Sequence, residues 1–183
     1  QSPGASMNLD EKLQIAEVLD SMRVDIIEAG FPIASNGDFE AVSEVSKHVK
    51  NSTIAGLARA SFKDIDRAWE AVQHAKSPRI HTFIATSPLH MKYKLKKTEE
   101  EVLEAIQKTV SHARNLCDNI EWSCEDGGRS ELEFLYQCIE LAINSGASTI
   151  NIPDTVGYTL PDEFGKIFKN VKNNVPNIDK AIL

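Results

Sequence analysis

The segment Ile120-Glu121-Trp122-Ser123-Cys124-Glu125 alternates apolar and polar side chains with a period of two. This alternation is typical of a β-strand, because successive side chains point to opposite faces. Glu121, Ser123 and Glu125 are therefore predicted to share one face. A parallel strand covered by helices on both sides is apolar throughout, so a polar face needs a different environment. We interpret the polar face as pointing inward.

Polar residues follow the same parity in other predicted strands. Asn151, Pro153 and Thr155 alternate along a second candidate, and His81 lies on one face of the segment Arg79–Ala85. Side chains that point inward in a closed parallel barrel collect at its carboxyl-terminal mouth, where ligands bind. The shared parity therefore predicts a polar ligand site built by several strands. Glu28 and Arg59 come late in their predicted strands and fit the same rim.

Short β-type runs alternate with amphipathic helices along the whole chain. The predicted strands are 24–28, 53–58, 79–85, 119–124 and 148–152, and another strand starts at 181. Three predicted helices begin with a capping box, in which a Glu follows the N-cap residue by three positions; the N-cap residues are Asn8, Thr98 and Ser130. This order is typical of a parallel α/β protein, either an open sheet or a barrel. We favour the barrel because no glycine-rich phosphate loop follows any strand.

Composition excludes several classes of function. The 183 residues carry a formal net charge of −7, with 42% hydrophobic and 26% charged residues, so a partner with a phosphate backbone or an anionic lipid surface is disfavoured. No run approaches the roughly 20 apolar residues of a membrane span, and no targeting segment is expected. Three cysteines without close pairing indicate reduced thiols and a cytoplasmic location. The lysine-rich run 92–97 is interpreted as a solvated face, or as a positive patch that attracts the anionic tail of a cofactor.

Each candidate residue also has a purely structural interpretation. A single buried histidine such as His81 is more often a hydrogen-bonded core residue than a catalyst, and the run Glu125–Gly128 has the composition of a turn. Arg59 could pair with a surface acid, and Pro153-Asp154 could simply end a strand. The shared parity over several strands favours the functional interpretation over a set of separate coincidences.

Several motifs, taken in order, resemble those of the 2-isopropylmalate synthase family, and the match runs along almost the entire chain. The matching segments are Gln1–Met7, Glu28-Ala29-Gly30-Phe31-Pro32, His81–Ser87, Ser123-Cys124-Glu125-Asp126 with Arg129-Ser130, and Asn151–Tyr158. The resemblance also extends to the wider group of metal-dependent barrel enzymes, which includes homocitrate synthase, citramalate synthase and hydroxymethylglutaryl-CoA lyase. It implies an α/β fold in which residues 1–183 form one partial catalytic TIM (β/α)8 barrel domain with roughly strands 2–6.

The resemblance implies an acyltransferase of leucine biosynthesis. Acetyl-CoA would be deprotonated at its methyl carbon, add to the keto group of 2-oxoisovalerate and undergo thioester hydrolysis to give 2-isopropylmalate. A divalent metal, Mg, Mn or Zn, would polarise the keto group. The intact enzyme would be a cytoplasmic homodimer that uses small-molecule substrates and needs neither nucleic acid nor membrane.

The resemblance also assigns roles to individual residues. Glu125 would orient the substrate or a water molecule, and Gln1, which matches the end of an Arg-Asp-Gly-Glu-Gln signature, would lie near the reacting carbon. Thr155 would donate a hydrogen bond to the carboxylate of the keto acid. The other substrate-binding candidates line the same pocket or its rim; they are His81, Ser123, Pro153, Glu28 and Arg59.

The departures from the family pattern concern the metal. The Arg and Asp of the signature would stand before Gln1, and a His-x-His pair of metal ligands would follow Leu183. We therefore assign no metal ligand to residues 1–183, interpret the chain as a fragment, and expect it to be inactive alone and prone to pairing at its sheet edges. The alternatives are a sister synthase of the homocitrate or citramalate type, and a non-catalytic α/β binding module.

Overall fold

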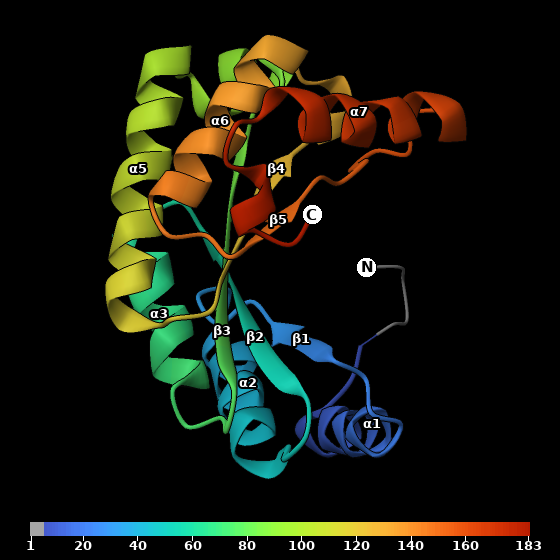
Figure 1. Ribbon diagram of the computed structural model, residues 1–183. Helices are drawn as coiled ribbons and strands as arrows, with labels where there is room; N and C mark the ends of the chain where they lie inside the picture. Colours follow the sequence, from blue (N-terminus) through green and yellow to red (C-terminus); the bar gives the residue numbers. More distant parts are fainter. Residues whose placement is uncertain (1–5) are drawn as a thin grey trace. The chain divides into compact units, whose positions relative to one another are not determined.

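The computed structural model describes residues 6–183, which alternate between strands and helices as the sequence predicts (Figure 1). The five strands are β1 (Ile26–Gly30), β2 (Thr53–Arg59), β3 (Pro78–Ala85), β4 (Ile120–Glu125) and β5 (Thr149–Asn151). The α-helices are α1 (Leu9–Ser21), α2 (Asn36–His48), α3 (Phe62–Val72), α4 (Pro88–His90), α5 (Glu99–Leu116), α6 (Leu132–Asn144) and α7 (Pro161–Asn174). Shorter turns of other helix types are η1 (Met91–Leu95), η2 (Gly127–Arg129) and η3 (Ile178–Lys180). No helix within residues 6–183 is long and apolar enough to cross a membrane.

The chain divides into two compact units. Within the described residues, unit 1 comprises 6–58 and 63–80, and unit 2 comprises 59–62 and 81–183. In unit 1 the strand order is β1, β2 and the start of β3, and β1 pairs with β2 in parallel. In unit 2 the order is β3, β4 and β5, and β4 pairs with β5 in parallel, with Ser123 opposite Asn151.

Unit 1 has an apolar core between its helices and strands. The core residues are Ala16, Ile27, Val42, Val45, Val49, Ile54, Ala71 and Val72. Asp20 at the end of α1 accepts hydrogen bonds from the backbone N–H groups of Lys50, Asn51 and Ser52 at 3.2, 2.9 and 2.8 Å. This carboxylate therefore joins α1 to the turn that leads into β2.

Unit 2 is built around the apolar face of β4. Ile120, Trp122 and Cys124 are at most 1% exposed, and β4 lies against both α5 and α6, which also contact each other (Figure 1). The helices contribute buried residues at helical spacing; these are Val102, Ile106, Val110 and Ala113 from α5 and Leu135, Cys138, Ile139 and Ala142 from α6. The side chains on the other face of β4, which are those of Glu121, Ser123 and Glu125, therefore point away from these two helices, as the alternation predicts.

Local sequence signals set several element boundaries. Asn8 and Thr98 form the predicted capping boxes with Glu11 and Glu101, and Pro161 occupies the first turn of α7. The first strand differs from the prediction in its start: β1 begins at Ile26 rather than at residue 24. At the chain end, residue 182 makes an isolated parallel bridge to Thr149 of β5, at the position where a new strand is expected.

One predicted helix cap is wrong. The N-cap residue of α6 is Glu131 rather than Ser130, and it makes no side-chain capping bond. The Ser130 hydroxyl instead lies 2.7 Å from the hydroxyl of Thr86 and donates to the carbonyl of Asp126 at 3.3 Å. The hydroxyl therefore joins the loops that follow β3 and β4 instead of the first turn of α6.

Candidate functional site

A layer of polar side chains crosses β3, β4 and β5 in unit 2. His81 Nε2 lies 2.5 Å from Ser123 Oγ, and the Asn151 side-chain amide donates to the same oxygen at 3.0 Å. Glu121 Oε1 is 3.6 Å from His81 Nε2. His81 and Ser123 are 8% and 4% exposed, so the layer is largely shielded from water. The predicted parity therefore brings His81, Ser123 and Asn151 together.

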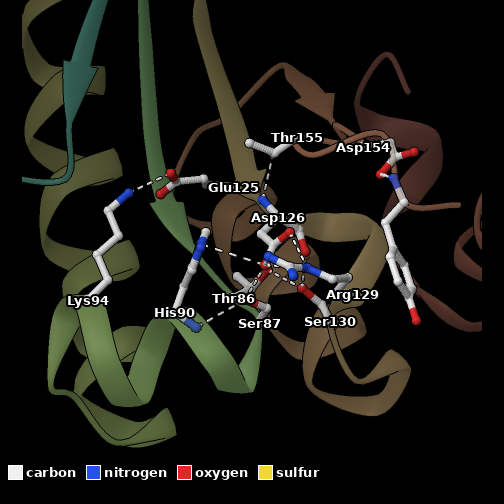
Figure 2. A network of polar contacts seen from close by, with 11 residues as sticks. Thr86, Ser87, His90, Lys94, Glu125, Asp126, Arg129, Ser130, Asp154 and Thr155 are labelled. Atoms are coloured by element: carbon white, nitrogen blue, oxygen red, sulfur yellow. Dashed lines mark hydrogen bonds and ion pairs between the residues drawn. The ribbon is translucent and has the colours of Figure 1, made fainter.

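Glu125 is the last residue of β4, where its side chain meets the segment after β3. Its Oε1 accepts a hydrogen bond from Lys94 Nζ of the π-helix η1 at 2.5 Å (Figure 2). Its carbonyl accepts the backbone N–H of Thr86 at 3.2 Å. The carboxylate at the end of β4 is thus held against a cation.

Asp126 is the junction of the loops that follow β3, β4 and β5 (Figure 2). Its side chain is 1% exposed and accepts hydrogen bonds from Ser87 Oγ at 2.6 Å and from Arg129 Nη2 at 2.8 Å. His90 Nδ1 lies 3.6 Å from the same oxygen, Oδ2. Burial favours the neutral acid, but the bonds from Arg129 and Ser87 outweigh it, so the pKa of Asp126 lies below its ordinary value.

Thr155 follows β5 and is bound directly to this junction. The backbone N–H of Asp126 donates to Thr155 Oγ1 at 2.8 Å, and the Thr155 residue is exposed. Pro153 is half-buried, and its carbonyl accepts the N–H of Gly128 at 3.4 Å. Asp154 closes the loop by accepting the N–H groups of Tyr158 and Thr159, both at 3.0 Å.

Two of the remaining predicted site residues, Arg59 and Glu28, lie within the described part of the chain. Arg59 is the last residue of β2 and is exposed. Glu28 lies in β1 of unit 1, where it lines a cavity of about 510 Å³. Gln1 lies outside the described residues.

Sequence reasoning missed several members of the cluster. Lys94 belongs to the lysine run interpreted as solvated, but it forms the pair with Glu125. Asp126 lies in the run Glu125–Gly128 interpreted as a turn, but its buried carboxylate forms an ion pair with the half-buried Arg129 at 2.8 Å. Glu121 and Asn151 belong to the predicted polar face but not to the predicted site residues, although they share the parity of Ser123 and His81.

The cluster combines hydrogen-bond donors with compensated negative charge. Lys94 and Arg129 are paired with Glu125 and Asp126, while Ser123, Thr155 and Asn151 supply neutral polar groups. This arrangement is suited to a small polar ligand rather than to a large apolar one. Residues 6–183 contain no group of three or more His, Cys, Asp or Glu that could hold a metal ion. The described residues therefore do not fit a complete divalent metal site.

The family model described as HMGL-like matches residues 1–183. The chain belongs to the HMGL-like family. Among curated relatives, the 2-isopropylmalate synthases of Rhodopseudomonas palustris and Caulobacter vibrioides are both 60% identical over 182 residues, covering 100% of this chain. That of Ruminiclostridium cellulolyticum is 60% identical over 99% of this chain. These relatives confirm the predicted resemblance. This HMGL-like chain spans about 35% of the length of the first two relatives.

Solved structures agree with this family at the level of the fold. Hydroxymethylglutaryl-CoA lyase from Pseudomonas aeruginosa matches with a TM-score of 0.73 and 17% identity, covering 95% of this chain and 60% of the lyase chain. The Bacillus subtilis HMG-CoA lyase matches with a TM-score of 0.70 and 18% identity, covering 94% of this chain and 60% of that chain. The predicted α/β class, with the strand and helix units of a partial barrel, is confirmed.

Proposed function

We propose that residues 1–183 form part of the catalytic barrel domain of a 2-isopropylmalate synthase. The observation that carries the proposal is 60% identity over the whole chain to curated enzymes of that name. The reaction would join the methyl carbon of acetyl-CoA to the keto carbon of 2-oxoisovalerate, and thioester hydrolysis would then release CoA and 2-isopropylmalate. The enzyme would act as a cytoplasmic homodimer in leucine biosynthesis.

The polar cluster of unit 2 supports binding of the 2-oxo acid. Thr155 would donate its hydroxyl hydrogen to the substrate carboxylate, and Glu125 would orient the substrate or a water molecule. His81, Ser123 and Pro153 would line the pocket, with Asn151 holding the Ser123 hydroxyl at 3.0 Å. Arg59 and Glu28 are proposed for the rim, and Gln1 for a position near the reacting carbon.

The proposed enzyme would also need a divalent metal, Mg, Mn or Zn, to polarise the keto group. Because residues 6–183 provide no cluster of three metal-binding side chains, we expect residues 1–183 alone to bind no metal tightly and to be inactive. Titration of this chain with Mn²⁺ or Zn²⁺ in a calorimeter should give no tight site. A stoichiometric site, or turnover by residues 1–183 alone, would contradict this expectation.

The decisive experiment measures substrate choice in the gene product that contains residues 1–183. CoA release from acetyl-CoA is followed with 2-oxoisovalerate, pyruvate or 2-oxoglutarate as the second substrate, and the product is identified by mass spectrometry. We expect the largest kcat/KM with 2-oxoisovalerate. Preference for pyruvate or 2-oxoglutarate would identify a sister synthase. The substrates must be compared directly, because one methylene changes the discrimination between substrates by only about 1–3 kcal/mol. No release with any 2-oxo acid would favour a non-catalytic binding module.

A further inference from the structure

The buried carboxylate of Asp126 holds an unusual backbone conformation directly after β4. Asp126 has a φ of +64°, in the left-handed region. L-residues other than glycine adopt this region at a cost, and Asp and Asn tolerate it best. Ser87 reaches the carboxylate from the loop after β3, and Arg129 reaches it from η2 (Figure 2). The side chain is therefore held by two separate segments.

This conformation directs the Asp126 backbone N–H toward Thr155. The N–H belongs to the peptide between Glu125 and Asp126, and one of the two torsions that orient this peptide is the left-handed φ. The N–H donates to Thr155 Oγ1 at 2.8 Å. Since Thr155 is exposed, its hydroxyl can contact Asp126 and a ligand at the same time.

The bond from Asp126 holds the Thr155 hydroxyl oxygen in place and leaves the hydroxyl hydrogen to be donated. A hydroxyl carries one hydrogen to donate and two lone pairs to accept. The Asp126 N–H uses one lone pair, so the hydroxyl keeps its hydrogen and its second lone pair, and the hydrogen can be donated to a ligand that only accepts, such as a carboxylate. Hydrogen bonds in a chain also polarise one another, which strengthens the donation.

The negative charge of Asp126 is compensated and buried, so it does not repel an approaching anion. Arg129 forms an ion pair with it at 2.8 Å, and His90 Nδ1 lies 3.6 Å from the same carboxylate oxygen. Asp126 is 1% exposed, so its carboxylate has little contact with the surface that a ligand would reach. Its backbone N–H is linked to that surface through Thr155.

We propose that Asp126 is a positioning residue for the 2-oxo acid, because its buried carboxylate holds the backbone N–H that fixes the Thr155 hydroxyl where it donates to the substrate carboxylate. This inference rests on the proposed function and deepens it, since neither the turn composition nor the parity of the strands assigns Asp126 a role. Asp126 acts through Thr155 and does not touch the substrate.

The test compares Asp126→Asn with Asp20→Asn in the gene product that contains residues 1–183. Both replace a carboxylate that holds several hydrogen bonds, but Asp20 lies in α1 of unit 1. We expect Asp126→Asn to raise the KM for the 2-oxo acid about tenfold, the effect of one weakened bond to a charged group. Its kcat and its KM for acetyl-CoA should change less than about threefold. Asp20→Asn should leave the KM for the 2-oxo acid unchanged.

Hydrogen exchange gives a second measurement that needs no substrate. Thr155→Val removes the acceptor of the Asp126 N–H, so peptides covering residues 125–130 should exchange faster, whereas Thr155→Ser should keep the slow exchange. If Asp126→Asn fails to fold, Ser87→Ala serves instead, because it removes one bond at 2.6 Å and leaves those from Arg129. This variant should raise the KM for the 2-oxo acid about threefold.

Two failures can be told apart. If the unchanged protein turns over no 2-oxo acid, the proposed function is wrong and this inference falls with it. If the unchanged protein is active but Asp126→Asn and Ser87→Ala keep its KM for the 2-oxo acid, only the positioning role of Asp126 is wrong. Equal exchange in Thr155→Val and Thr155→Ser would also overturn it.

Discussion

The imidazole Nε2 of His81 lies 2.5 Å from the hydroxyl oxygen of Ser123, although 42 residues separate them in the chain. Asn151 donates to the same oxygen at 3.0 Å, so one hydroxyl connects β3, β4 and β5. Because the layer is largely buried, each lost partner leaves a polar group that water replaces poorly. The stability of unit 2 and its proposed ligand site therefore depend on the same small group of side chains.

Replacing Ser123 by Ala should destabilise the protein by about 1–3 kcal/mol, since it leaves His81 and Asn151 without their shared partner. The free energy of unfolding is measured by urea denaturation. The matched control is Ser21→Ala, because the exposed Ser21 hydroxyl only donates to the Val18 carbonyl; its effect should stay within about 0.5 kcal/mol. Equal effects of the two variants would show that the polar layer adds nothing to stability.

Lys94→Met should weaken 2-oxo acid binding with little loss of stability. The Lys94 side chain is 50% exposed, and pairs of this kind contribute only about 0–1 kcal/mol to folding. Without this cation, Glu125 carries uncompensated charge next to an anionic substrate, so the KM for the 2-oxo acid should rise. Lys94→Arg should retain most of the affinity. Lys92→Met is the control, because it removes a neighbouring cation whose described contact is with the Tyr93 ring, 5.1 Å from its centre, and not with Glu125. A similar rise in KM for Lys92→Met would show that the overall positive charge of the run, and not the pair with Glu125, aids binding.

Asp20 should make stability depend on pH under acidic conditions. Burial opposes ionisation, but backbone hydrogen bonds from Ser52, Lys50 and Asn51 outweigh it and lower the pKa of Asp20 to about 2. The unfolded chain therefore binds a proton at higher pH than the folded chain does. The stabilisation is complete above the ordinary pKa of 3.8 and is lost as the pH falls through about 2.

Asp20→Asn should therefore lower the urea midpoint at pH 7, and its difference from the unchanged protein should shrink below pH 4. The control is Asp118→Asn, whose side chain is 96% exposed and should matter little at either pH. A constant difference between pH 7 and pH 3 would contradict the assigned pKa.

The cysteines should resist thiol reagents in the folded protein. Cys117, Cys124 and Cys138 are all free and buried. Burial raises the pKa of Cys124 to about 12, and it raises the pKa of Cys138 as well. Little thiolate, which is the reactive form, is present at pH 8. Labelling with a chromogenic disulfide should be slow in buffer and reach three thiols in denaturant; rapid labelling of a folded sample would refute this.

Local patterns account for the parts of the fold that sequence predicts well. The boxes Asn8 with Glu11 and Thr98 with Glu101 form as expected, because a capping box connects residues three positions apart. The parity of β4 also holds, since a strand turns its side chains alternately whatever surrounds it. One boundary still differs from the prediction, since β1 starts at Ile26 rather than at residue 24.

The sequence by itself determined the alternation of strands and helices, the apolar face of β4, and the set of polar residues on its other face. Only the tertiary structure decided which polar groups meet. It pairs Lys94 with Glu125 and links Asp126 to Thr155, and the Ser130 hydroxyl bonds to Thr86 instead of capping a helix. These partners come from different loops, separated by 29 to 44 residues. Their meeting depends on strand pairing and on the path of each loop, which a local pattern of side chains does not encode.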